Sequence, residues 1–147
     1  MDDRRHQEYT GRPLDKVLDS LEYVCSYIRS HDKPSEIWIR TPIIPNTTSR
    51  PENIRQIGEY IHNNCIDLVT RWDLLAFNNL CKDKYQRLNL NWNFTDADLI
   101  TSQEKDLLLR VAQETIPTPE IIHWGGSTKL EQDKVNNISI NACTDQT

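Results

Sequence analysis

The residues best suited to metal or covalent chemistry are four cysteines, Cys25, Cys65, Cys81 and Cys143. None lies in a CxxC pair, and their spacings match neither a zinc site nor an iron–sulfur motif. Cys81 lies alone in a polar segment, and a lone thiol is more often a small buried hydrophobic residue than a ligand or nucleophile. No apolar segment of a secretory signal follows the charged first residues, so we expect reduced thiols in the cytoplasm.

The four histidines lack the mutual spacing of shared metal ligands; they are His6, His31, His62 and His123. The sequence contains no GxGxxG, P-loop, HExxH or GxSxG motif. Rossmann, nucleotide-kinase, zinc-protease and serine-hydrolase functions are therefore unsupported. We predict no metal site in this chain.

Arg40 is the most unusual charged residue, because it lies within the apolar segment 36–45. A guanidinium inside an apolar strand is unfavourable unless a carboxylate or a polar ligand compensates its charge. Two interpretations follow: Arg40 contacts a ligand, or it forms a structural ion pair with an Asp or Glu at the edge of the core.

A second group of candidates lies in the long segment 76–98, which follows a predicted strand. Loops of this length in compact domains are usually functional or disordered. The carboxyl ends of strands are where α/β sheets bind ligands. The candidates for contacts there are Asn78, Asn79, Lys84 and Tyr85. For each of them, a turn residue or a solvated loop residue is the alternative interpretation.

The elements that position these residues are predicted by hydrophobic periodicity. A helix is expected over about 13–30, with one apolar stripe, followed by a β-branched strand over 36–45. Pro51 begins a second helix, which ends near residue 64 and precedes a strand over 66–75. Thr101–Glu104 is a capping box before a third helix, and 120–124 is a short last strand. Alternating helices and strands predict an α/β fold with a parallel sheet, and the continuous apolar run predicts a strand covered on both faces.

Composition narrows the class of protein further. The chain has 147 residues, about one domain, with 37% hydrophobic residues and a formal net charge of -5. An acidic chain with scattered Lys and Arg argues against nucleic-acid binding. No apolar run approaches the ~20 residues of a membrane-spanning helix, so we expect no membrane association.

The number of strands is too small for a complete parallel sheet, which typically has about 5 strands. We therefore expect a missing strand upstream of Met1, so that the chain is the C-terminal part of a larger α/β barrel or sheet. Its first strand would have an unpaired edge, which favours dimers or aggregates. The alternative is that residues 1–11 pair with the sheet and complete it.

Four segments carry a family resemblance. Residues 1–11 end in Glu8-Tyr9-Thr10-Gly11, and residues 37–45 read IWIRTPIIP. Pro51-Glu52-Asn53-Ile54 follows, and residues 74–85 read LLAFNNLCKDKY. In order and spacing these segments resemble four consecutive segments of one enzyme family. These are the part after that family's strand four, the IR-x-P-x-x-P ending of its strand five, the start of the next helix and the LLPYHxLGxxKY segment after its strand six. The family is that of the glycyl-radical-enzyme activating enzymes, radical SAM proteins of the pyruvate formate-lyase activase type.

The resemblance covers about residues 1–110 and implies parallel βα units of a partial (β/α)6 radical SAM barrel. Residues 1–124 would be its C-terminal half, and 125–147 a polar, disordered tail. The family holds S-adenosylmethionine (SAM) against a [4Fe-4S] cluster and takes hydrogen from a glycine of a glycyl radical enzyme. Flavodoxin or ferredoxin donates the electron. The cluster needs a CxxxCxxC loop, which these 147 residues lack, so the chain is expected to be inactive alone.

The resemblance also implies roles for single residues. Arg40 matches a family Arg near the SAM site, and Asn78 stands where the family usually has His, so these two are the SAM-side candidates. Asn79, Lys84 and Tyr85 would face the partner enzyme. Ala76 replaces a family proline and Cys81 a glycine, which loosens the match. Two other functions stay open: a non-catalytic module that docks a glycyl radical enzyme, and an unrelated small α/β domain.

Overall fold

The computed structural model describes residues 1–31 and 33–128. The chain begins with helices α1 (Asp3–Thr10) and α2 (Leu14–Ser30), followed by strand β1 (Ile37–Ile43), helix α3 (Pro51–Asn64) and strand β2 (Val69–Ala76). The short helix α4 (Lys82–Arg87), helix α5 (Ser102–Gln113), the 3-10 turn η1 (Pro119–Ile121) and strand β3 (Ile122–Gly125) complete it. Every predicted helix and strand is present within a few residues of its expected bounds.

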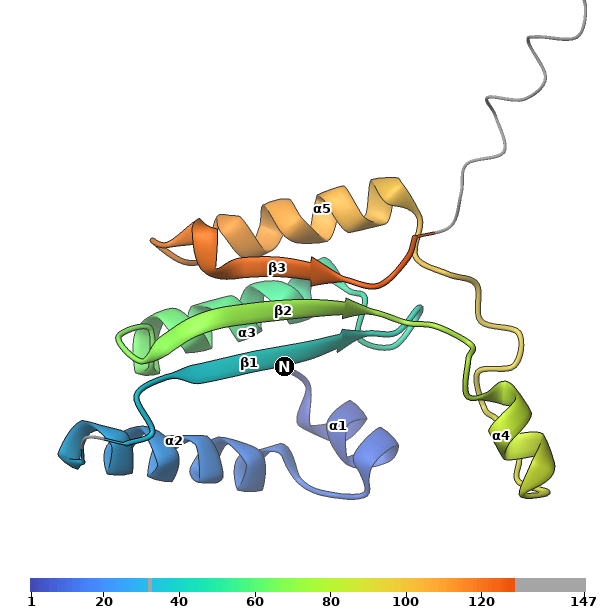
Figure 1. Ribbon diagram of the computed structural model, residues 1–147, viewed down its shortest axis with the longest axis horizontal. Coiled ribbons are helices and arrows are strands. Elements are labelled where there is room, and N and C mark those ends of the chain that lie inside the picture. Colours follow the sequence, from blue (N-terminus) through green and yellow to red (C-terminus); the bar gives the residue numbers. More distant parts are fainter. Residues whose placement is uncertain (32, 129–147) are drawn as a thin grey trace, which may run out of the picture.

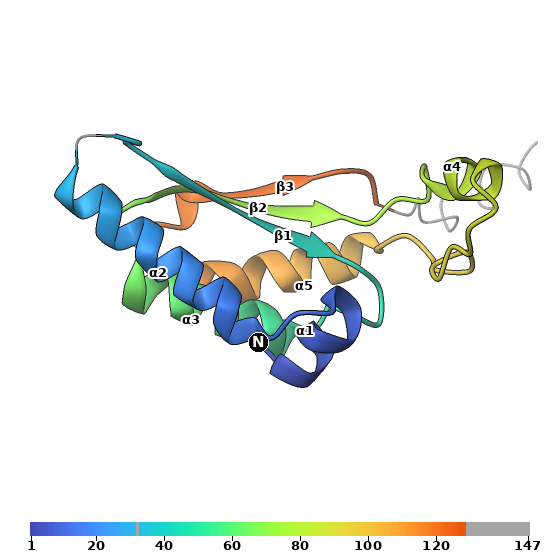
Figure 2. The same cartoon turned by 90° about the horizontal axis from the view of Figure 1, so that it is seen from below.

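The three strands form one parallel sheet in the order β1-β2-β3 (Figure 1). This confirms the α/β fold with parallel βα units. Helices α2, α3 and α5 all lie on the same side of the sheet, and the opposite side carries no helix in the described part of the chain (Figure 2). The expectation that both faces are covered is wrong, because outward-facing residues of β1 such as Trp38 and Arg40 are exposed.

The core lies between the sheet and the three helices. Its largest fully buried side chain is Trp72 on β2, whose indole N–H donates to the hydroxyl of Thr41 on β1 at 3.0 Å. That bond satisfies the only polar atom of the indole inside the core. Gly58 on α3 lets the helix approach closely, because a Cβ there would overlap the side chain of Thr115 and crowd Trp72.

Helix α5 begins with the predicted capping box. The Thr101 hydroxyl accepts from the backbone N–H of Glu104, and the Glu104 carboxylate accepts from the backbone N–H of Thr101. Two orphan N–H groups of the first turn are thereby satisfied. The buried residues Leu108, Val111 and Ala112 then place the apolar face of α5 against the sheet.

Two segments differ from the expectation. No element was predicted within residues 1–11. They contain helix α1, because Asp2 caps its first turn and Gly11 ends it in the left-handed region at φ 71°. The alternative that this segment completes the sheet is therefore wrong. The segment 76–98 contains α4 and is not an extended loop. The predicted tail 125–147 begins within β3 at Gly125, and its residues 129–147 lie outside the described part.

Candidate functional site

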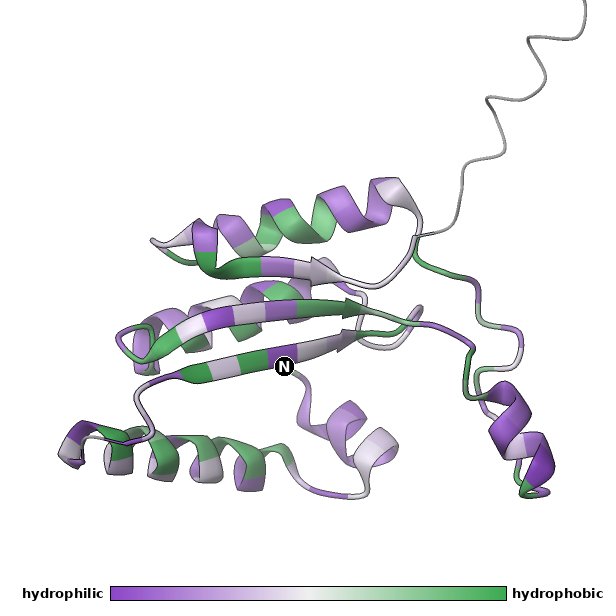
Figure 3. Cartoon of the chain, viewed as in Figure 1, coloured by the Kyte–Doolittle hydropathy of each residue, from purple (hydrophilic) through white to green (hydrophobic). Residues whose placement is uncertain are grey.

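The side of the sheet opposite the helices is the candidate functional surface. We call it the open face, and its residues follow from strand alternation and register: Trp38, Arg40, Pro42, Arg71, Asp73, Leu75, His123 and Gly125. Hydrophilic and hydrophobic residues alternate along β1 (Figure 3). The alternation sends the apolar set toward the helices and leaves charged residues on the open face.

Asp73 is the centre of the open face. Its side chain is only 5% exposed, and its two carboxylate oxygens meet different arginines. The Arg71 Nε lies 2.8 Å from Oδ1, and the Arg40 Nε lies 3.5 Å from Oδ2. Two guanidinium groups thus compensate one nearly buried carboxylate, as such a carboxylate requires.

Arg40 lies on the open face with a side chain that is 62% exposed. The expectation of a guanidinium enclosed in an apolar strand is therefore wrong. Every second residue of β1 points away from the core, and Arg40 is one of these residues. The ion pair with Asp73 is the structural interaction that the sequence analysis offered as the alternative to a ligand contact. The exposed remainder of the guanidinium leaves N–H donors toward solvent.

Arg71 links Asp73 to the amino end of the sheet. Its guanidinium lies 5.1 Å from the ring centroid of Trp38, a cation–π arrangement. The indole N–H of Trp38 donates to Glu36 at 2.9 Å, and the Thr70 hydroxyl donates to the same carboxylate at 2.8 Å. These two hydrogen bonds lower the pKa of Glu36 from its ordinary value.

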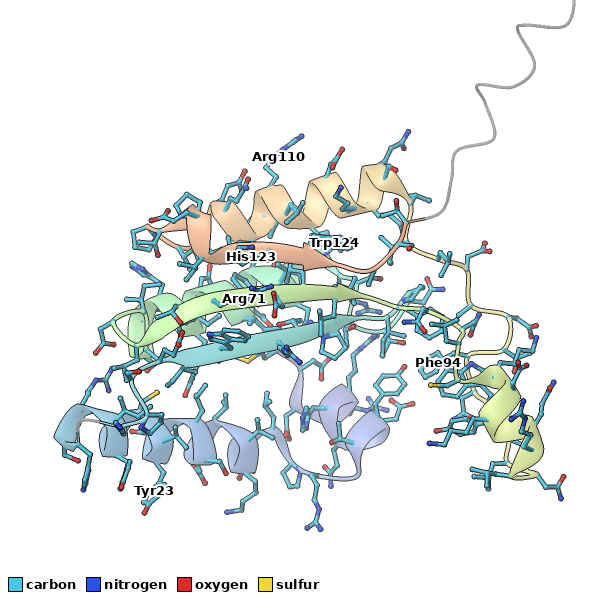
Figure 4. The ribbon with its side chains drawn as sticks, viewed as in Figure 1. Tyr23, Arg71, Phe94, Arg110, His123 and Trp124 are labelled. Atoms are coloured by element: carbon cyan, nitrogen blue, oxygen red, sulfur yellow. The ribbon has the colours of Figure 1, made fainter. Side chains whose placement is uncertain are left out.

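His123 is the third polar residue of the central row. It pairs in register with Asp73, as Arg40 does from the other side. Figure 4 shows His123 on the strand next to Arg71. Arg71 and Asp73 were not among the candidates from the sequence, and His123 was considered there only for metal-ligand spacing, which it lacks. The alternation of Arg71 and Asp73 around buried Trp72 is the signal that could have identified them.

Asn78 lies beyond the carboxyl end of β2, and its side chain is exposed. Its Oδ1 accepts a hydrogen bond from the backbone N–H of Leu80 at 3.1 Å. This is the local turn geometry typical of Asn, and it corresponds to the alternative role as a turn residue. Arg40 therefore lies in the middle of β1, whereas Asn78 lies after the end of β2.

Asn79 and Tyr85 hold the α4 segment together. The Asn79 side chain accepts from the Trp92 indole at 2.9 Å and donates to the Ala97 carbonyl at 3.2 Å. Tyr85 packs against Trp92 with ring centroids 4.6 Å apart, and Phe94 contacts the same indole at 5.7 Å. This aromatic cluster orders a segment that lies beyond the carboxyl ends of the strands (Figure 1).

The exposed residues around the aromatic cluster include a charge and leucines. Lys84 on α4 is exposed, as is Leu80, and Leu88 and Leu90 are more than half exposed. A shallow hollow of 380 Å³ adjoins the segment at the carboxyl end of β1. It is lined by Pro45, Asn46, Asp96, Ala97, Asp98, Leu99, Thr101 and Glu104.

The described cysteines do not form a cluster site. Cys25 and Cys65 are buried near α2 and α3, whereas Cys81 is exposed beside α4, so its interpretation as a buried hydrophobic residue is wrong. Within residues 1–31 and 33–128, no group of three or more His, Cys, Asp or Glu could hold a metal ion. These residues do not fit a [4Fe-4S] cluster. Among the same residues, no helix is long and apolar enough to cross a membrane.

Comparison with known proteins supports the resemblance predicted from the motifs. No family model matches the chain. The pyruvate formate-lyase-activating enzyme of Clostridium pasteurianum is 31% identical over 81 residues, which cover 55% of this chain and 33% of that protein. The enzyme of the same name from Staphylococcus aureus (strain USA300) is 22% identical over 98 residues, or 67% of this chain and 36% of that protein. The chain is thus similar to pyruvate formate-lyase-activating enzymes and aligns with about a third of their length.

Proposed function

We propose that this chain supplies the SAM-facing βα units of a glycyl-radical-enzyme activating enzyme. The observation that carries the proposal is the similarity to pyruvate formate-lyase-activating enzymes. The motif order assigns β1 and β2 to strands five and six of a partial (β/α)6 barrel, in the C-terminal half. The assignment rests on the residues of those two strands.

The arrangement of layers supports a barrel segment. In a βα barrel the helices form the outer layer and one face of the strands lines the interior. Here the helices cover one face only (Figure 2), and the open face carries Arg40, Arg71 and Asp73. An ion-paired, hydrogen-bonding surface of this kind suits the lining of a polar cofactor site, and it is too charged to be packed against another apolar layer.

Arg40 and Asn78 are the residues that we assign to the SAM side. Arg40 retains exposed N–H donors beside its pair with Asp73, and Asn78 exposes an amide after the strand end. In a complete enzyme of this family, SAM bound at a [4Fe-4S] cluster would supply the 5′-deoxyadenosyl radical. The residues of this chain would hold and orient SAM. We assign no radical step to them, since the cluster ligands are absent from the 147 residues.

The proposed partners are a glycyl radical enzyme and, for the complete enzyme, flavodoxin or ferredoxin in the cytoplasm. Lys84 is the partner-facing residue with an exposed charge on the α4 segment. Asn79 and Tyr85 act by keeping that segment folded, through their contacts with Trp92.

A non-catalytic docking module is the second candidate function. It is favoured by the absence of a CxxxCxxC motif from the sequence and by the lack of a metal-binding group among the described residues. In this case the chain binds a glycyl radical enzyme with no requirement for SAM.

A binding experiment separates the two functions. The tagged 147-residue chain is incubated with pyruvate formate-lyase, with and without SAM, and the retained enzyme is quantified. Retention that SAM increases supports the activase segment, and retention independent of SAM supports the docking module. Arg40→Ala should remove the increase in retention that SAM causes. Lys84→Glu should weaken retention with and without SAM. Lys16→Glu, at an exposed position of α2, is the matched control. No retention in either condition would contradict both functions.

A further inference from the structure

Two buried thiols lie between helices α2 and α3, remote from the open face. Cys25 belongs to the apolar stripe of α2 and is 3% exposed, and Cys65 directly follows α3 and is 1% exposed. Both belong to the same core cluster. The proposed function uses neither of them.

A clamp formed by Arg29 holds the two thiol-bearing segments together. Its Nη2 donates to the backbone carbonyl of Asn64 at 2.8 Å and to the Asp67 carboxylate at 2.7 Å, while its Nε donates to the other Asp67 oxygen at 3.0 Å. Arg29 lies four residues after Cys25, and its two acceptors flank Cys65. The bidentate pair therefore restricts movement of α2 relative to the end of α3 on either side of Cys65.

A hollow connects the thiols to the surface. It measures 280 Å³, and both cysteines line it, together with Leu21, Glu22, Arg29, Tyr60, Asn63 and Asn64. Its size exceeds what one water molecule needs, which leaves room for a small reagent beside the two cysteines.

The two thiol groups lie close enough to interact, and both belong to residues that line this hollow. Burial, as the largest cause, and interaction with the Cys25 thiol together raise the pKa of Cys65 to about 12. At neutral pH the Cys65 thiol is protonated, so little of the reactive thiolate is present. Its attack on a bulky electrophile is therefore slow.

We infer that Cys25 and Cys65 are a redox-active dithiol, which a low-molecular-weight disulfide converts to an internal disulfide that joins α2 to the end of α3. The first cysteine loses its proton and attacks one sulfur of the reagent, whose S–S bond breaks and releases one small thiol. The second cysteine loses its proton and attacks the mixed disulfide, which releases the second small thiol. Two electrons pass from the dithiol to the reagent, and the protein retains one S–S bond.

The experiment uses the full chain and cystamine, a small disulfide, as the reagent. After incubation, free thiols are alkylated under denaturing conditions, and the chain is digested without reduction and mapped by mass spectrometry. The expected result is a linked peptide pair containing Cys25 and Cys65, with two of the four thiols lost to this bond. Below the thiol pKa, the rate of linkage should rise by up to about tenfold for each pH unit.

The matched control is Cys81→Ser, which removes the exposed thiol and should retain the linked pair. Cys25→Ser should abolish it, and the thermal midpoint of the oxidised wild type should exceed that of the reduced wild type. Alkylation of both Cys25 and Cys65 after prolonged oxidation would overturn the inference. Linkage of either one preferentially to Cys81 or Cys143 would overturn it as well. The assay needs neither SAM nor a partner enzyme, so its result does not depend on the proposed function.

Discussion

The carboxylate of Asp73 organises the charged residues of the open face. It is nearly buried although it lies on the uncovered side of the sheet, because Arg40 and Arg71 extend over it. The position of either guanidinium therefore depends on one acidic side chain.

Asp73→Ala should destabilise the chain by roughly 1–2 kcal/mol, since both guanidinium groups lose their nearly buried partner but remain partly hydrated. Arg40→Gln should cost less than about 1 kcal/mol, because Arg40 is mostly exposed. Urea unfolding of both variants measures the difference in unfolding free energy. Equal losses would contradict the central position of Asp73 in the network.

The Arg29–Asp67 clamp predicts a pH dependence. The hydrogen bond from Arg29 lowers the pKa of Asp67 below its ordinary value. A lowered folded-state pKa contributes stability that is complete above the ordinary value and is lost as the pH falls through the lowered value. The stability difference between wild type and Asp67→Asn should therefore shrink in acid, as followed by urea midpoints across pH. A difference that stays constant down to the most acidic buffer would exclude this linkage.

At the scale of elements, the close approach of α3 to the sheet depends on Gly58. A Cβ at this position would overlap Thr115 and lie 3.2 Å from the Trp72 ring. The same position explains why a glycine is present in the middle of a helix, where it is normally unfavourable by about 1 kcal/mol.

Gly58→Ala should destabilise the chain by roughly 1–3 kcal/mol, as overpacking does, despite the better helix propensity of Ala. The measurement is the thermal or urea midpoint. The same substitution in a Thr115→Gly background should cost less, because the overlapping side chain is gone. A stabilised Gly58→Ala variant would show that α3 can shift away without loss of packing.

At the scale of the whole molecule, the sheet is small and partly uncovered. In the described residues β1 pairs only with β2, and the open face has no helix over it. Unpaired strand edges offer a row of backbone N–H and C=O groups to another chain. Exposed Val17, Val24 and Tyr27 on α2 add apolar surface.

The isolated 147-residue chain should therefore associate as its concentration rises. Sedimentation velocity over a concentration series should show a growing fraction of dimers or larger species. Sharp monomer sedimentation at every concentration would contradict the prediction and would indicate that the edge of β1 is protected.

The amino-acid sequence by itself determined the order and type of the main elements, the capping box of α5 and the family resemblance. These features depend on local periodicity, on residues a few positions apart and on short motifs, so they can be interpreted without knowledge of the fold. Helix α1 was not predicted, because its charged sequence has no apolar stripe. Asp2 and Gly11, at its two ends, are nevertheless residue types that usually cap helices.

Only the tertiary structure decided which side chains meet. Strand register placed Arg40, Asp73 and His123 in one row, and the packing of α2 placed Cys25 and Cys65 around one hollow. These residues are far apart in the sequence, and a one-residue change of register would move a strand's side chains to the other face. The pairing of Arg40 with Asp73 thus follows from long-range contacts, which the local pattern around either residue does not contain.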